Sequence, residues 1–319
     1  MDIGAPDTLV DAIRYFSDPD RTLALWVAIR WPDCVKCPRC DSAQVSFIKT
    51  RRIWKCSQKH DHRQFSAKVG SIFEDSPLGL DKWFTAMWLV ANCKNGVSSY
   101  EIARALKVTQ KTAWFMDHRI RLAMQTGSFE KMKGEVEADE TFIGGLARFM
   151  HKDKKAKITG TGGAGKVAVM GLLERHGKDG VSRVHAKVLK NVQRTTLHGE
   201  IQEHVESGSE MFTDAWIGYR GIAPEYVHGV IDHAEKYADG RIHVNGIENF
   251  WSLLKRGLKG TYVSVEPFHL FRYLDEQAFR FNGRKATDGE RFVEALAGAT
   301  GRRLTYKEVT GKHIPPTLQ

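Results

Sequence analysis

The stretch GEVEADETFIGG, residues 134–145, marks a change along the chain from helical to strand-like sequence. Its polar and apolar residues alternate, which is typical of a half-buried β-strand. A helical stretch is expected near residues 195–206. Four more strands are expected in VAVMGLLER (167–175), VSRVHAKVLK (181–190), SEMFTDAWIGY (209–219) and EYVHGVID (225–232). From residue 134 onward the sequence therefore predicts an α/β domain.

Two helices are expected after these strands, in HVNGIENFWSLLKRGLKG (243–260) and PFHLFRYLDEQAFRFNGR (267–284). Three sequential strands followed by helices and further strands is the order of an RNase H-like fold. Residues 134–284 are therefore expected to form such a domain around a mixed five-stranded sheet, in which the first and fourth strands are neighbours. Residues 285–319 are expected to add one helix and an irregular tail.

A cysteine-rich segment precedes this domain. Residues 1–30 predict one or two short helices, and residues 31–79 carry two pairs of potential metal ligands at knuckle spacing, Cys-x2-Cys and Cys-x3-His. Such soft or borderline ligands suit one tetrahedral, structural zinc ion. The expected ligands are Cys37, Cys40, Cys56 and His60. Cys34 and His62 remain alternative ligands, while Cys93, in an apolar helix, is expected to be a core residue.

Residues 80–126 predict a helical unit that could read DNA. Ser98 and Glu101 form a capping box, and Thr109 follows a tight turn and caps a longer helix. This is the helix-turn-helix arrangement, although any three-helix bundle could give a similar pattern. The residues expected to reach base edges are Gln110, Lys111, Thr112 and Trp114. Those expected to contact phosphate are Arg119 and Arg121.

The charge balance favours a polyanionic partner. The chain of 319 residues has 48 Lys and Arg against 38 Asp and Glu, a formal net charge of +10. Such an excess promotes binding to nucleic acid through counterion release. No run of about 18 apolar residues is present, and the acidic, amphipathic N-terminus is unlike a secretory signal. A cytoplasmic, nucleoid-associated protein that does not enter membranes is expected.

Three carboxylates from distant segments are candidates to meet at one edge of the sheet. Asp139 lies on the first expected strand, Asp214 ends the fourth, and Glu248 lies on the helix after the fifth. Clustered anions repel each other unless cations separate them, and hard oxygen ligands favour Mg²⁺ or Mn²⁺. Two such ions suit phosphoryl transfer. The basic residues expected to grip the DNA backbone beside Glu248 are Lys255, Arg256 and Lys259.

Alternation alone does not select Asp139. It places Glu135, Glu137 and Asp139 on one side of the strand and Glu140 on the other, and a strand acid is ordinarily an exposed surface residue.

A glycine-rich motif, GTGGAGKV (160–167), nearly fits a phosphate-binding loop. It lacks the Ser or Thr that would bind magnesium, and it precedes a strand, so nucleotide binding there is not expected.

Several longer motifs indicate a family. They are CPRC (37–40), RQFSAKVGSIFEDSPLGLDKW (63–83), EADETFIGG (137–145), FTDAWIGY (212–219), HVNGIENFWSLLKRGLKG (243–260) and RFNGR (280–284). With them the chain resembles the ISXO2-like family of bacterial insertion-sequence DDE transposases. These proteins join a zinc ribbon and a helix-turn-helix to an RNase H-like catalytic domain.

The resemblance implies an enzyme that cuts terminal inverted repeats and joins the 3′ ends to target DNA. It maps the acid triad onto Asp139, Asp214 and Glu248, and a supporting lysine onto Lys255. Some members of this group have asparagine as the third ligand, so the flanking Asn245 and Asn249 remain alternatives to Glu248. A homodimer or a larger assembly is expected on DNA.

Two other functions fit parts of the sequence. The zinc ribbon and helix-turn-helix would suffice for a sequence-specific DNA-binding regulator with an inactive catalytic domain. An RNase H-like nuclease that cuts branched DNA would share the same acids and metal ions.

Overall fold

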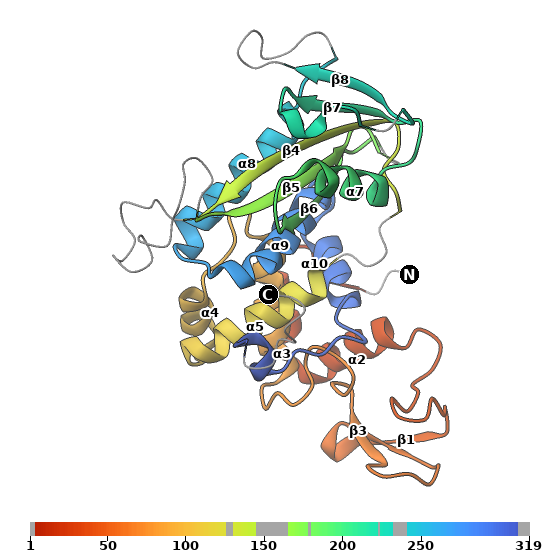
Figure 1. Ribbon diagram of the computed structural model, residues 1–319. Helices are drawn as coiled ribbons and strands as arrows, with labels where there is room; N and C mark the ends of the chain where they lie inside the picture. Colours follow the sequence, from red (N-terminus) through yellow and green to blue (C-terminus); the bar gives the residue numbers. More distant parts are fainter. Residues whose placement is uncertain are drawn as a thin grey trace. The chain divides into compact units, whose positions relative to one another are not determined.

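A computed structural model of the chain describes residues 4–125, 130–144, 165–177, 180–222, 224–231 and 241–311. The chain forms two compact units, Met1–Gln125 with Ala286–Gln319, and Thr126–Lys285 (Figure 1). Within these ranges, no helix is both long enough and apolar enough to cross a membrane. Most of the glycine-rich stretch 160–167 lies outside the described residues, so its exclusion as a nucleotide site stays a prediction.

Helices from both ends of the chain build the first unit. They are α1 (Leu9–Phe16), α2 (Pro19–Arg30), α3 (Leu80–Asn92), α4 (Ser99–Leu106), α5 (Gln110–Met124), α10 (Asp288–Ala297) and α11 (Tyr306–Val309). The ring of Phe292 in α10 lies 5.1 Å from that of Phe16, 5.6 Å from Phe84 and 5.5 Å from Trp88. The C-terminal helix, expected as an appendage, is therefore part of this core.

The turn between α4 and α5 follows the capping residues closely. Ser98 and Glu101 form the expected capping box, and the side chain of Thr109 accepts a hydrogen bond from the backbone N–H of Thr112. Lys107 ends α4 in the left-handed conformation, with φ of 51°. These local signals fix a short helix, a tight turn and a longer helix, as the sequence predicts.

A small antiparallel sheet carries the cysteine-rich segment. It contains β1 (Val45–Ile48), β2 (Ile53–Cys56) and β3 (Gln64–Ser66), with the 3₁₀ turn η1 (Lys49–Arg51) between the first two. Trp54 on β2 stacks on Phe65 of β3 with ring centroids 6.1 Å apart, and Trp31 packs against both rings. This apolar cluster is small, so the sheet depends on further cross-links for its stability.

A mixed five-stranded sheet forms the centre of the second unit, as the sequence predicts. Its order is β6-β5-β4-β7-β8, with β4 antiparallel to β5 and parallel to β7. The strands are β4 (Glu135–Ile143), β5 (Val167–Glu174), β6 (Arg183–Leu189), β7 (Glu210–Asp214) and β8 (Val227–Ile231). The first and fourth strands of this unit are therefore neighbours.

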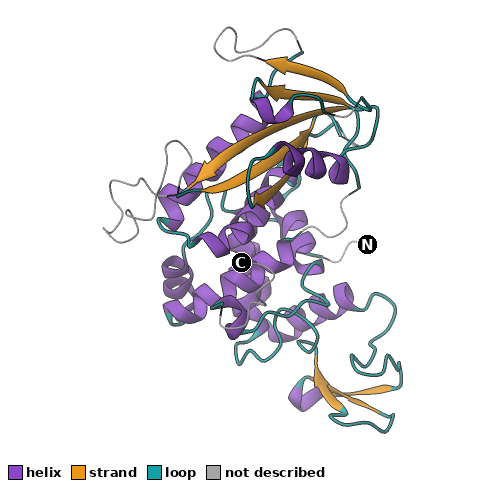
Figure 2. Cartoon of the chain, in the orientation of Figure 1, coloured by secondary structure: helices purple, strands orange, loops and turns teal. Residues whose placement is uncertain are grey.

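Helices cover both faces of this sheet (Figure 2). One face packs against α7 (Arg194–His204) and the 3₁₀ turn η3 (Ile217–Tyr219) through Ala138, Met170 and Met211. The other face packs against α8 (Asn245–Gly257) and α9 (Leu270–Asn282), which the 3₁₀ turn η5 (Pro267–His269) precedes.

The helix expected over residues 243–260 changes form near its end. Helix α8 stops at Gly257, and a π-helical turn, η4 (Leu258–Tyr262), continues the chain. A π-turn has more residues per turn than an α-helix. Lys259 lies in this π-turn, after the last residue of α8.

Candidate zinc-ligand cluster and acidic site

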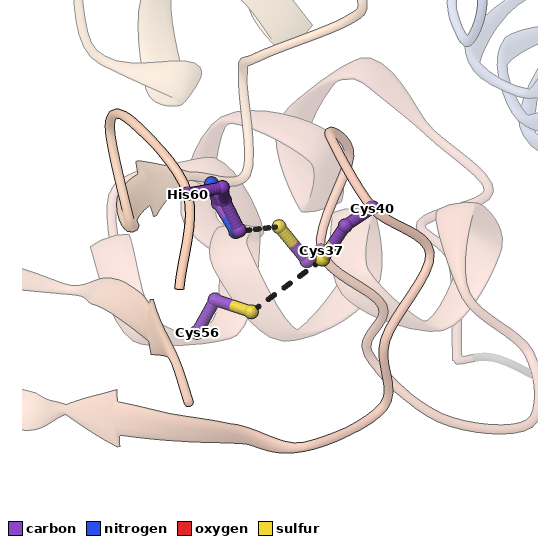
Figure 3. A group of neighbouring side chains, drawn as sticks. All are labelled: Cys37, Cys40, Cys56 and His60. Atoms are coloured by element: carbon purple, nitrogen blue, oxygen red, sulfur yellow. Dashed lines mark hydrogen bonds between the residues drawn. The ribbon is translucent and has the colours of Figure 1, made fainter. Parts of the chain in front are cut away.

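The two knuckles of the first unit bring four ligand atoms together (Figure 3). The Sγ atom of Cys37 lies 3.5 Å from Nε2 of His60, and the Sγ atoms of Cys40 and Cys56 are 3.6 Å apart. Zn–S bonds of about 2.3 Å and Zn–N bonds of about 2.0–2.1 Å give tetrahedral edges of about 3.8 Å and 3.5 Å. The donor set and its spacing therefore fit one structural zinc ion.

The geometry also decides between the alternative ligands. The ligand atoms of Cys37, Cys40, Cys56 and His60 all lie within 4.8 Å of one another. Cys34 and His62 are exposed and lie outside this group. Nδ1 of His60 is 2.7 Å from the carbonyl oxygen of Asp61, which orients the ring so that Nε2 faces the sulfurs.

In the second unit, the acids of β4 separate into two groups. Arg175, which follows β5, donates from Nε to Oε1 of Glu137 at 2.7 Å and from Nη1 to Oε2 of Glu135 at 3.1 Å. Glu137 is only 1% exposed. Both glutamates are therefore neutralised within the protein, whereas Asp139, on the same side of the strand, is not bound to Arg175. These tertiary contacts distinguish Asp139 from Glu135 and Glu137, which the alternation of the strand could not do.

Asp139 and Asp214 lie next to each other on neighbouring strands. Ala138 of β4 pairs with Thr213 of the parallel strand β7, so the two aspartates are the next residues on neighbouring strands. Val136 and Met211, paired in the same register, both face the α7 side. Alternation then directs Asp139 and Asp214 to the opposite face, which α8 covers.

Burial is the largest cause of the raised pKa of Asp139, the negative charges of Asp214 and Glu248 add to it, and the resulting pKa is about 6. The indole of Trp251 acts in the other direction, donating a hydrogen bond to Oδ2 of Asp139 at 2.9 Å. Asp139 therefore lies within electrostatic reach of both Asp214 and Glu248. Their mutual repulsion is the condition that a bound cation would relieve.

The basic residues of α8 lie further along the helix. Lys255 is two turns after Glu248 and shares its face, while Arg256 is exposed in the last turn. Asn245 and Asn249 are also exposed on this helix. The charge of Glu248 helps to raise the pKa of Asp139, and Asn245 and Asn249 stay alternative ligands.

Glu140, to which the sequence assigned no role, is a second perturbed acid. It points to the α7 side, where burial and, to a lesser extent, the charges of Asp139 and Asp214 raise its pKa to about 8, against the lowering effect of the Tyr219 hydroxyl. Alternation predicts the face of the sheet to which Glu140 points. The burial of Glu140 comes from η3, whose position beside β4 is set by the tertiary fold.

The candidate DNA-contacting residues of α5 divide by exposure. Lys111 is exposed, with its ammonium 4.8 Å from the ring of Tyr306, and Thr112 and Trp114 are half-buried. Gln110 is half-buried too and donates to Oγ of Ser99 at 2.9 Å. The N-terminal end of α5 therefore keeps polar side chains within reach of a partner.

The expectation that Arg119 and Arg121 contact phosphate is wrong. Arg119 is 5% exposed and donates to the backbone carbonyls of Ile72, Glu74 and Leu304. Arg121 is 1% exposed. The guanidinium group of Arg119 points into the first unit, where the C-terminal segment supplies the carbonyl of Leu304.

A zinc-ligand cluster precedes a mixed sheet whose strands β4 and β7 carry neighbouring aspartates. Residues 131–282 match the ISXO2-like transposase domain, and residues 20–60 match the transposase zinc-ribbon domain. The chain belongs to the ISXO2-like transposase family, and the expected family is confirmed.

Two relatives extend this result. A transposase-like protein of Haemophilus influenzae is 35% identical over 101 residues, covering 31% of this chain and 81% of that protein. A protein in the transposable element ISH50 of Halobacterium salinarum is 24% identical over 290 residues, covering 86% of this chain and 96% of that protein. The similarity to the second relative therefore includes both units.

Proposed function

We propose that the protein binds the terminal inverted repeats of an insertion sequence and catalyses metal-dependent cleavage and transfer of DNA strands. Asp139, Asp214 and Glu248 would hold two Mg²⁺ or Mn²⁺ ions. The observation that carries the proposal is the register of β4 and β7, which makes Asp139 and Asp214 neighbours. Burial and the charges of Asp214 and Glu248 also raise the pKa of Asp139. A group of hard oxygen donors suits a small divalent cation.

The chain's own residues would prepare this site. When bound, the ions would activate the attacking water or 3′-hydroxyl and stabilise the departing oxyanion. Trp251 orients the Asp139 carboxylate through its indole N–H. Lys255, on the same face of α8 as Glu248, would contact the DNA backbone close to the acids.

We further propose that the second unit has an RNase H-like fold and that α4 and α5 form a helix-turn-helix. The strand order, with β4 between β5 and β7, supports the first assignment. The tight turn at Lys107 and the exposed Lys111 at the start of α5 support the second. Strand transfer requires two DNA ends to be held together, so the protein would work as a dimer or a larger assembly at the nucleoid.

The test uses labelled DNA carrying the inverted repeats that border the gene, incubated with the full chain and Mg²⁺. We expect divalent-dependent cleavage at the repeat ends, and loss of cleavage in Asp139→Asn. Glu206→Gln, which changes an exposed carboxylate of the same unit, serves as the matched control. Equal cleavage by the wild type and Asp139→Asn would eliminate the proposal.

The same assay separates the two competing functions. A DNA-binding regulator would bind the repeats in a salt-dependent, sequence-specific way and cleave nothing with Mg²⁺ or Mn²⁺. A structure-selective nuclease would cut branched junctions in preference to repeat ends. Preserving three repelling acids at the end of a sheet costs stability, which favours a catalytic use for them.

A further inference from the structure

Both oxygens of the Glu137 carboxylate accept hydrogen bonds from protein donors. Its Oε1 atom accepts from Nε of Arg175 at 2.7 Å, and its Oε2 atom accepts from the backbone N–H of Ile247 at 2.8 Å. Glu137 is 1% exposed and lies on the same side of β4 as Asp139, two residues away. It is thus beside the acidic site and bound through both oxygens to protein donors.

The contact with Ile247 replaces a missing helix cap. Helix α8 begins after Val244, and no side chain of its own segment caps its N-terminus. A carboxylate at this position satisfies an N–H of the first turn and interacts favourably with the helix dipole. Glu137 therefore attaches the start of α8 to strand β4, and Glu248 is the residue that follows Ile247.

Gly246 allows this close approach. A Cβ atom at position 246 would lie 2.9 Å from Oε2 and 3.1 Å from Oε1 of Glu137. Because Arg175 holds the carboxylate, the side chain could not move away without breaking that ion pair. The glycine is needed for space at the point where the helix meets the sheet.

Arg175 extends the attachment to the segment before α8. It donates from Nη1 to the carbonyl oxygen of Arg241 at 2.8 Å, and from Nη2 to the carbonyl oxygen and to Nδ1 of His243. Its guanidinium also lies over the ring of Phe212 on β7, 4.4 Å from the centroid. One buried arginine therefore joins β4, β7 and the chain that enters α8.

We propose that Glu137 and Arg175 are positioning residues that fix the start of α8, and with it Glu248, opposite Asp139 and Asp214. The inference rests on the proposed function, because it assigns these residues to the metal site of that reaction. The pair acts by holding the third acid in place. Loosening it should weaken binding of the ions, while an excess of ions should restore much of the reaction.

The test compares Glu137→Gln, which removes the charge at constant size, with Gly246→Ala, which adds the Cβ atom that meets Glu137. Arg175→Lys, which keeps the charge and loses the planar fork, is a third variant. Gly199→Ala is the matched glycine control, since a Cβ atom there meets nothing within 4 Å. Mn²⁺ binding is measured by electron paramagnetic resonance, and repeat-end cleavage is titrated with Mn²⁺.

We expect the three variants to need roughly 10-fold or more Mn²⁺ for half-saturation, the range seen when partners of metal ligands are removed. At saturating Mn²⁺ they should recover most of the wild-type rate, which loss of a purely structural contact would not produce. The control Gly199→Ala should match the wild type in both measurements.

The outcomes distinguish the two proposals. A wild type that neither binds Mn²⁺ nor cleaves DNA would overturn the proposed function and this inference with it. An active wild type, with all variants matching Gly199→Ala in Mn²⁺ requirement, would overturn the inference alone. Failure of all three variants to fold, judged by circular dichroism, would also overturn it, because the pair would then be structural only.

Discussion

The indole N–H of Trp251 donates to Oδ2 of Asp139 at 2.9 Å, which joins α8 to the strand that carries the first acid. Trp251 lies one turn after Glu248 on the same helix. Its ring packs over Gly171 of β5, where a Cβ atom would come within 2.6 Å of it. Helix α8 therefore supplies one acid and orients another, and its distance from the sheet is set by a glycine.

Replacing Trp251 with Phe should raise the pH that cleavage requires. The indole hydrogen bond lowers the pKa of Asp139, so its loss moves that pKa above about 6. Losing a hydrogen bond to a charged group, worth about 1.5–3 kcal/mol, should reduce cleavage near pH 7 about 2- to 15-fold. The difference from the wild type should shrink at pH 9, where the carboxyl is ionised in both proteins. A pH profile of cleavage that runs parallel to that of the wild type would contradict this prediction for Trp251→Phe.

Asp139→Asn should stabilise the metal-free protein at neutral and alkaline pH. The carboxyl has a pKa of about 6 in the fold against 3.8 for the free side chain, so its ionised form is disfavoured by folding. The penalty is complete above pH 6, declines as the pH falls from 6 to 4, and is absent below that range. It amounts to about 3 kcal/mol at most.

This stability difference is measured by urea unfolding in EDTA at pH 8 and at pH 4. Adding Mg²⁺ at pH 8 should stabilise the wild type more than Asp139→Asn, because only the wild type keeps the full acid group. A variant that is less stable than the wild type at pH 8 would show that the acids do not repel each other.

Zinc should be present at about one equivalent per chain. Cys56→Ser removes one of four converging ligands and should abolish zinc retention, together with the structure of the ribbon formed by β1, β2 and β3. Cys34→Ser is the control, because Cys34 is exposed and outside the ligand group, and it should keep its zinc. Elemental analysis of freshly purified protein measures both. Equal zinc content in the two variants would refute the assigned ligands.

Lys111 and Arg119 should behave differently although they share α5. Arg119→Ala leaves three carbonyl groups without their donor and should lower the free energy of unfolding by about 2–4 kcal/mol. Lys111→Ala should leave stability nearly unchanged and reduce the salt dependence of DNA binding by about one unit of slope. Thermal unfolding and binding titrations at several salt concentrations give the two quantities. Reversed effects would restore Arg119 as a DNA contact.

Periodicity and spacing were sufficient for the parts of the fold that local signals determine. The five strands, the capping box of Ser98 and Glu101, and the paired knuckles all follow from residues that are close in sequence. The sequence alone identified the four zinc ligands. The structure was needed only to exclude Cys34 and His62, which lie close to those ligands in the sequence.

The remaining features depend on contacts between distant segments. Glu135, Glu137 and Asp139 look equivalent on their strand, and only Arg175, some 40 residues later, distinguishes them. The same holds for Arg119, whose partner Leu304 lies 185 residues away. No periodicity encodes such pairings. The π-turn at the end of α8 was also missed, because its residues suit an α-helix equally well.

The placement of Phe292 in the core of the first unit has a consequence for synthesis of the protein. Its aromatic neighbours Phe16, Phe84 and Trp88 leave the ribosome roughly two hundred residues or more before it does. We therefore expect a nascent chain that stops near residue 125 to expose these rings and to be degraded. A truncated product of this gene would not survive as a free-standing repressor of its own element.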